Sequence, residues 1–382
     1  MKVAILTTDN REHFKSYHET APHFGTAPEA LLQGFETMPD TELHIVSCIR
    51  QAVAAPQKLA PNIWFHSLHV PRLGWTATAF QGCIRAARRK LHEINPDIVH
   101  GQGTERDCAI SAIFSGFKNV VTIHGNMQEL ARLFKAPVGS FGWFAAHLET
   151  FTLKRTSGVF CNSEYTENLV KPRTPKTWRV PNPIRKAFFD TPKTAVAKEK
   201  CFLINVGLIS PRKRQIELLE VARRVHEMGL RLELQFIGGF GSGAYSDTFR
   251  EKIKEAEAKG YARHIGFKST AELIATFDAV HGLVHFPSEE AFGLVVAEGM
   301  ARDLKFFGSR LGGIIDITNG VPGAELFGAQ DWDGLANGIA NWIRAGHPRA
   351  NGAAAIMAER YHPTVIARRH LEIYNEVLND GR

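Results

Sequence analysis

The sequence lacks any long hydrophobic run. No window approaches the roughly 18 consecutive apolar residues of a membrane-spanning helix. The opening apolar stretch ends at polar Thr8–Arg11 and is too short for a secretory signal. Cysteine is scarce as well: the five residues are odd in number, widely scattered and form no CxxC pair, which indicates buried thiols and argues against a disulfide framework or a zinc site. We therefore expect a cytoplasmic chain.

The chain also lacks an acidic excess. Hydrophobic residues make up 44% and charged residues 22%, which is typical of a globular protein, and the net charge is +7. Residues 1–186 hold 22 Lys and Arg against 15 Asp and Glu, so the whole excess lies in the first half. This favours an anionic acceptor or an anionic lipid surface, at the inner face of a membrane. No nucleic-acid motif accompanies the charge, so nucleic acid is not expected as a partner.

Three arginines could carry such a lipid contact. Arg85, Arg88 and Arg89 stand at i, i+3 and i+4 of a helix that we expect over residues 77–93, and they face one way. An ordinary solvated helix face is the favoured interpretation of this pattern, and contact with an anionic lipid or a lipid-linked acceptor is the functional alternative.

Short apolar segments alternate with helical ones along the whole chain. Examples are Val3–Thr7, Leu43–Ser47 and Val120–Ile123, and the pattern restarts at Cys201–Gly207. Short buried strands alternating with helices predict parallel α/β sheets. The restart follows a proline-dense stretch that suits an interdomain linker, formed by Pro172, Pro175, Pro181, Pro183 and Pro192. We place the domain boundary near residue 186.

The strongest chemical signal is the segment Phe286–Ala301. A buried strand ends at Pro287, and Phe292, Gly293 and Leu294 open an apolar helix. Glycine permits a close approach to the backbone, and the free N–H groups of a helix start can bind phosphate oxygens. Glu290 lies in the turn, and Glu298 lies among apolar residues, where a carboxylate needs partners such as ribose hydroxyls. A dipole-stabilising Glu290 and a solvated Glu298 are the alternative from these residues alone.

This segment resembles the E-x7-E signature of glycosyltransferase family 4, the large retaining group with the GT-B fold. The resemblance implies two Rossmann-like domains facing across a cleft, residues 1–186 on the acceptor side and 187–361 on the nucleotide-sugar side. It implies that residues 362–382 form a final helix packed back on the first domain. By the same resemblance Glu290 contacts the donor sugar, Glu298 holds the ribose, and Phe292, Gly293 and Leu294 belong to the donor site.

A second matching segment is Val206–Lys213, which is similar to the family's Gly-Arg-Leu…Lys turn. Lys213 matches the lysine that faces the diphosphate, where a cation stabilises the leaving group. Leu208 departs from the family, which usually has arginine there, and Arg212 or Arg214 is a hypothetical substitute. Taken without the resemblance, the cluster favours a solvated basic loop.

Further matches extend over nearly the whole chain. Thr122–Gly125 resembles a strand end whose histidine, His124, hydrogen-bonds the donor sugar, whereas for His100 structural and functional interpretations stay open. Gly25 lies near the family's first glycine-rich loop, although a plain loop fits it as well. Gly266 and Phe267 lie where the nucleotide base is usually met. Val180–Ile184, Asn162–Thr166 and Leu311–Ile314 also resemble family segments.

Two further segments resemble known motifs but are not assigned the function of those motifs. Gly238–Gly243 lacks the spacing of a dinucleotide fingerprint. Asp331–Asp333 resembles a DxD metal motif, but the sequence after it reads as a helix with Asp331 as its N-cap, so no metal site is assigned.

The resemblance implies retaining transfer of a hexose-type sugar from a nucleotide-diphosphate sugar to an acceptor hydroxyl of a glycan or a lipid-linked molecule, without a metal or other cofactor. His124, Lys213 and Glu290 are the expected catalytic residues. Three alternatives stay open: a degenerate nucleotide-sugar-binding protein, a GT-B sugar-nucleotide epimerase, and a nicotinamide- or flavin-linked oxidoreductase. The last is disfavoured by the missing fingerprint.

Overall fold

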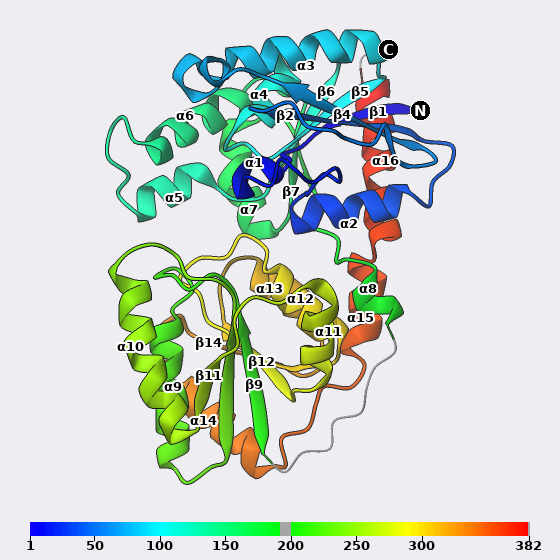
Figure 1. Cartoon of the computed structure of the whole chain (residues 1–382). Coiled ribbons are helices and arrows are strands. Elements are labelled where there is room, and N and C mark those ends of the chain that lie inside the picture. Colours follow the sequence, from blue (N-terminus) through cyan, green and yellow to red (C-terminus); the bar gives the residue numbers. More distant parts are fainter. Residues whose placement is uncertain (192–199, 381–382) are drawn as a thin grey trace. The chain divides into compact units, whose positions relative to one another are not determined.

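The computed structural model describes residues 1–191 and 200–380. The chain divides into two compact units, one formed by residues 1–185 and 361–382 and the other by residues 186–360. Each unit is an α/β sandwich built on its own sheet (Figure 1). Among the described residues, no helix combines the length and the apolar character needed to cross a bilayer.

The first unit contains an eight-stranded sheet in the order β3-β4-β2-β1-β5-β6-β7-β8, parallel except for the β3–β4 pair. Its strands are β1 (Lys2–Leu6), β2 (Glu42–Ile49), β3 (Lys58–Ala60), β4 (Ile63–His69), β5 (Ile98–Gln102), β6 (Asn119–Ile123), β7 (Val159–Cys161) and β8 (Thr177–Arg179). Its helices are α1 (Arg11–Phe14), α2 (Thr26–Phe35), α3 (Gln81–Ile94), α4 (Asp107–Ile113), α5 (Met127–Leu133), α6 (Phe141–Leu153), α7 (Glu164–Val170) and α16 (Pro363–Asn379), with short 3-10 turns η1 (Arg72–Gly74), η2 (Thr76–Thr78) and η3 (Lys171–Arg173).

Strand β1 shows why this sheet is covered on both faces. Successive side chains of a strand point to opposite faces. Val3 and Ile5 pack in one core cluster with residues of α2 and α16. Ala4 and Leu6 pack in another cluster with residues of α3 and α4. The helix α16 therefore returns to the first unit, as the resemblance implied.

The second unit contains a six-stranded parallel sheet in the order β11-β10-β9-β12-β13-β14. Its strands are β9 (Cys201–Val206), β10 (Leu232–Ile237), β11 (Ala262–His264), β12 (Gly282–His285), β13 (Lys305–Ser309) and β14 (Ala324–Phe327). Its helices are α8 (Ala187–Asp190), α9 (Gln215–Glu227), α10 (Ala244–Lys259), α11 (Thr270–Asp278), α12 (Leu294–Ala301), α13 (Gly312–Thr318), α14 (Trp332–Arg344) and α15 (Ala353–Tyr361). One face packs on α9, α10 and α14 in a single cluster.

The proline-dense stretch is not a linker along its whole length, although the boundary predicted near residue 186 agrees with the division of the chain between residues 185 and 186. Thr177–Arg179 forms β8, which pairs with β7 at the edge of the first sheet. Val180 and Ile184 are buried, because this segment supplies apolar side chains to the first unit. Pro192 lies outside the described residues.

Candidate functional site

Two turns of the second unit meet at the point where its strand order reverses. β9 lies between β10 and β12 in the sheet. The chain adds β10 and β11 on one side of β9 and then adds β12, β13 and β14 on the other side, so the strand order reverses at β9. In open parallel sheets, ligands bind at such a switch point, outside the carboxyl ends of the strands. The turn after β9 contains Lys213, and the turn after β12 contains Glu290. Sheet topology thus brings the two predicted residues to one edge.

Direct contacts join the two turns. The backbone N–H of Ser288 donates to the carbonyl of Arg212 at 2.8 Å, and the Arg212 guanidinium reaches a carboxylate oxygen of Glu289 at 3.1 Å. Burial raises the pKa of Glu289, and Arg212 opposes this effect. Arg212 therefore ties the turns together through Glu289.

The centre of the site is an ion pair between Lys213 and Glu290. Nζ of Lys213 donates to Oε2 of Glu290 at 2.5 Å, and the two side chains are only 15% and 12% exposed. Burial by itself would raise the pKa of Glu290. The Lys213 charge and a hydrogen bond from His285 outweigh burial and hold this pKa well below its usual range. Glu290 is therefore a carboxylate at neutral pH.

His285, the last residue of β12, was not predicted. Its Nε2 lies 2.8 Å from Oε2 of Glu290 and 3.5 Å from Nζ of Lys213. A carboxylate only accepts, so Nε2 carries the proton that is shared with Glu290. The ring is fully buried, and its Nδ1 finds no hydrogen-bond partner among the described residues. Burial and the Lys213 charge lower the pKa of His285, so the ring is neutral at pH 7. The only sequence signal was a histidine inside the apolar run Gly282–Phe286.

Glycines allow two backbone segments of this site to approach each other closely. Gly313 donates its N–H to the carbonyl of Glu290 at 3.1 Å. Gly312 has φ +51°, and a Cβ built there would lie 2.0 Å from the same carbonyl oxygen. Gly293 has φ +102° and is the N-cap of α12. These contacts explain the glycines in Leu311–Ile314, a segment noted only as a resemblance.

Three of the remaining predicted donor residues of this unit lie in the same turn and helix as Glu290, whereas Arg214 does not. Glu298 is buried on α12, five residues after Gly293. Phe292 is buried and Leu294 begins α12. Arg214 is directed elsewhere: its guanidinium donates to the carbonyl of Ala329 at 2.7 Å.

Two further predicted features lie at the same carboxyl edge of the sheet. Gly266 follows β11, and its carbonyl accepts from the N–H of Gly238 at 3.0 Å. The side chain of Phe267 is 82% exposed. A Cβ on Gly238 would lie 2.2 Å from the Gly207 carbonyl oxygen, so this glycine serves close packing of two turns.

His124 and Gly25 lie in the first unit. Nε2 of His124 is 2.8 Å from Oε1 of Gln102, and desolvation lowers the pKa of His124 to about 4. Gly25 is the N-cap of α2. His100 is structural, because its two ring nitrogens contact the Tyr374 hydroxyl at 2.6 Å and the Thr122 hydroxyl at 2.7 Å inside the core.

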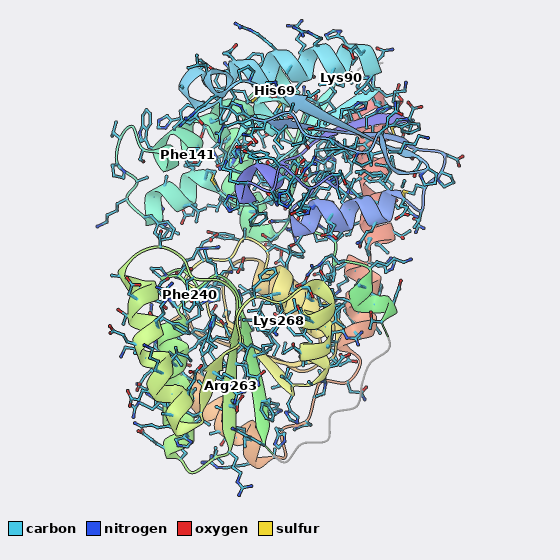
Figure 2. All side chains as sticks on the ribbon, in the orientation of Figure 1. His69, Lys90, Phe141, Phe240, Arg263 and Lys268 are labelled. Atoms are coloured by element: carbon cyan, nitrogen blue, oxygen red, sulfur yellow. The ribbon has the colours of Figure 1, made fainter. Side chains whose placement is uncertain are left out.

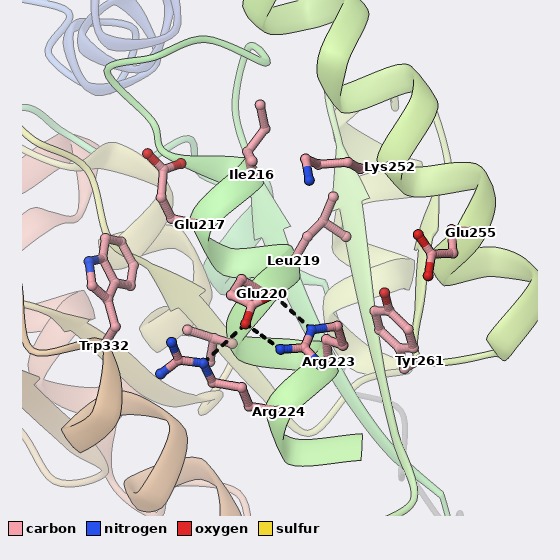
Figure 3. A pocket seen from close by; sticks show the side chains of 11 residues that line it. Ile216, Glu217, Leu219, Glu220, Arg223, Arg224, Lys252, Glu255, Tyr261 and Trp332 are labelled. Carbon is pink, nitrogen blue, oxygen red and sulfur yellow. Dashed lines mark hydrogen bonds and ion pairs between the residues drawn. The ribbon is translucent and has the colours of Figure 1, made fainter. Parts of the chain in front are cut away.

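A hollow of about 310 Å³ lies apart from this site, along α9, α10 and the start of α14 (Figure 3). Along α9, Glu220 accepts hydrogen bonds from Arg223 and Arg224, and Arg224 also pairs with Asp333. Asp331 accepts the N–H of Gly334 at 2.8 Å, which confirms that it is a helix N-cap. Nothing in these contacts points to a particular ligand, so we assign none here.

All five cysteines are buried and form no disulfide, as predicted; each lies in the described part of the chain. Cys48, Cys83 and Asp107 place their potential ligand atoms within 4.8 Å of one another. The contact with Cys83 and burial raise the pKa of Cys48 well above its usual value. A metal ion would have to displace this thiol proton.

Comparisons with known proteins follow the same division of the chain. A model described as Glycosyltransferase Family 4 matches residues 40–187, and one described as Glycosyl transferases group 1 matches residues 187–355. N-acetyl-alpha-D-glucosaminyl L-malate synthase of Bacillus anthracis is 25% identical over 350 residues, which is 85% of this chain and 87% of that protein.

Solved structures agree on the fold. Sucrose-phosphate synthase from Thermosynechococcus elongatus aligns over 100% of both chains with a TM-score of 0.77 and 15% identity. Anabaena HepE in complex with UDP-glucose aligns over 98% of this chain and 100% of its own, with a TM-score of 0.71 and 16% identity. The resemblance first drawn from Glu290 and Glu298 is confirmed: the chain belongs to the glycosyltransferase family 4 group and has the GT-B fold.

Proposed function

We propose that this glycosyltransferase moves a hexose-type sugar from a nucleotide-diphosphate sugar to an acceptor hydroxyl, with retention at the anomeric carbon and without a metal. The observation that carries the proposal is the Lys213–Glu290 pair at the switch point of the second sheet. The structure of HepE, a protein with a similar fold, was determined in complex with UDP-glucose, so UDP-glucose is the first donor to test.

The charges at the switch point match a diphosphate sugar. Lys213 supplies a cation, and the first N–H groups of α12 have no partner within the helix, so they can meet phosphate oxygens. Both would stabilise negative charge as it develops on the leaving β-phosphate. They supply at this position the positive charge that a metal ion would otherwise supply.

Glu290 has the character of a hydroxyl acceptor. Its pKa is held low, so at neutral pH it offers only lone pairs, which suits binding of sugar hydroxyls. Glu298 is assigned to the ribose and the exposed ring of Phe267 to the base. We assign His124 to the donor sugar from the first unit: its lowered pKa keeps it a neutral imidazole that can both donate and accept.

We propose that the reaction proceeds by front-face departure. Glu290 and Glu298 are both assigned to the donor, and the third carboxylate of this turn and helix, Glu289, is buried against Arg212. None of the three is then left for a covalent glycosyl intermediate. The departing β-phosphate then takes the acceptor proton while the acceptor oxygen bonds to the anomeric carbon.

The test is a thermal-shift screen with UDP, GDP, ADP, CDP and TDP sugars, followed by turnover with the stabilising donor. A bound donor raises the apparent melting temperature by mass action. Glu290→Gln and Lys213→Met should each lower nucleoside diphosphate release at least about 100-fold. Asp333→Asn, which breaks an exposed pair with Arg224, is the matched control and should turn over normally. Normal turnover in Glu290→Gln would refute the assignment.

One observation favours a second candidate, a nucleotide-sugar-binding protein without transfer activity. Leu208 stands where the family usually has arginine, and its side chain is exposed beside the donor turn. Donor-induced stabilisation with no release of nucleoside diphosphate, with every acceptor tried, would establish this candidate.

A further inference from the structure

The connection between α5 and α6 carries an exposed apolar surface. We call this segment, residues 127–153, the hairpin; its two helices pack on one another, and the loop between them curves outward (Figure 1). Within nine residues it exposes four large apolar side chains, with Phe134 at 58% and Val138 at 84% exposed; the set is Leu133, Phe134, Val138 and Phe141. Phe141 lies at the outer edge of this unit in Figure 2.

The exposure does not come from a loosely attached loop. Glu149, fully buried on α6, accepts the N–H of Met127 at 2.9 Å and so caps the start of α5. Its carboxylate also accepts from the Thr104 hydroxyl at 3.0 Å and from Arg173 at 2.8 Å. Ser140 caps the start of α6 by accepting the N–H of Trp143. The base of the hairpin is fixed, so its apolar end stays presented to solvent.

The charge around these side chains is positive. Within residues 127–155 the acidic side chains are Glu129 and Glu149; the first pairs with Arg132 and the second is buried. Lys135 is exposed between Phe134 and Val138. At the far end of α6, the Arg155 guanidinium lies 3.6 Å from the centre of the Phe151 ring. The cations beside the apolar end itself are Arg132 and Lys135, and apolar side chains next to cations match the interface of an anionic bilayer.

A protein partner fits this surface less well. A stable protein interface buries roughly 800 Å² on each side. Four side chains on a projecting loop offer less than that. Interfacial insertion requires only a few apolar side chains with neighbouring cations.

We propose that the hairpin inserts its apolar end into the headgroup region of an anionic phospholipid bilayer. The segment that carries the attachment site begins close to His124 in the chain, since α5 begins at Met127, three residues after His124, and the exposed apolar side chains begin at Leu133. A lipid-linked acceptor would be held at the membrane on which the enzyme docks. Only this last point rests on the proposed function; membrane attachment itself does not.

The experiment is sedimentation with vesicles of equal parts phosphatidylcholine and phosphatidylglycerol, compared with phosphatidylcholine alone. We expect the full chain to bind the anionic vesicles and to be partly released by salt. The hairpin variant Leu133→Ser/Phe134→Ser/Val138→Ser/Phe141→Ser should bind them at least about tenfold more weakly. Its control is Met228→Ser/Val365→Ser, which alters two exposed apolar side chains elsewhere and should bind as the parent does.

Three outcomes would overturn the proposal. The parent chain does not bind anionic vesicles, or the hairpin variant binds them as tightly as the parent does. In the third outcome, only the α3 variant Arg85→Gln/Arg88→Gln/Arg89→Gln loses its binding to the vesicles. Release of nucleoside diphosphate with a water-soluble acceptor separates this proposal from the preceding one. The hairpin variant should keep that turnover, whereas vesicle binding without any turnover would refute the transferase proposal and leave the membrane attachment standing.

Discussion

Replacing Lys213 with methionine removes the cation from a nearly buried carboxylate and tests the electrostatics of the site without any substrate. Breaking a buried ion pair by removing one partner typically destabilises by about 3–5 kcal/mol. The residual exposure of the two side chains, 15% and 12%, reduces our expectation to about 2–3 kcal/mol at pH 8. For a unit of this size, that change corresponds to a fall in Tm of roughly 5–10 °C.

The same substitution should change how stability depends on pH. In the parent chain the pKa of Glu290 is depressed by folding, so its contribution is present above the ordinary value of about 4.3 and is lost as pH falls through the folded pKa. Without Lys213, burial raises this pKa, and protonation relieves the unpaired charge. The difference in stability between Lys213→Met and the parent should therefore be largest near pH 8 and shrink towards pH 4.

The assay is thermal unfolding at several pH values, with hydrogen exchange at β9 and β12 to assign the effect to the second unit. Lys305→Met is the matched control, because Lys305 pairs with a half-exposed Glu325 at 2.9 Å and should matter by less than about 1 kcal/mol. In the double variant Lys213→Met/Glu290→Gln, part of the lost stability should return. A Lys213→Met protein as stable as the parent at pH 8 would refute the reasoning.

Two further predictions concern packing and titration. Gly312→Ala should lower the free energy of unfolding by roughly 2–3 kcal/mol and abolish donor-induced stabilisation, because the new Cβ would meet the Glu290 carbonyl. Gly346→Ala is the control for backbone strain alone, because Gly346 has φ +88° and open space around its Cβ. Equal losses of stability in the two variants would contradict the contact argument. His370 is buried, and its pKa is lowered to about 4. Its contribution to the free energy of unfolding is therefore complete above the unfolded pKa of about 6.5 and is lost as pH falls from that value towards the folded pKa. The parent chain should lose up to about 2 kcal/mol more than His370→Gln between pH 7 and pH 5 in urea unfolding, and parallel losses in both would remove His370 as the cause.

Sequence patterns predicted most of the fold because parallel strands are buried on both faces and read as short apolar runs. Val3–Thr7, expected as a buried strand, became β1 (Lys2–Leu6), and Cys201–Gly207, where the pattern restarts, became β9 (Cys201–Val206). The proline-dense stretch misled because proline is also tolerated beside a short edge strand, here β8. Local chemistry does not distinguish the two uses of proline.

The sequence by itself determined the alternation of strands and helices, the two-part organisation and the family signature at Glu290 and Glu298, since each of these is written in neighbouring residues. Only the tertiary structure decided that Lys213, 77 residues before Glu290, would pair with it, and that His285 would complete the contact. The physical reason is strand order: a parallel sheet brings turns together at its carboxyl edge according to which strands are neighbours, and no local pattern specifies that β9 lies beside β12.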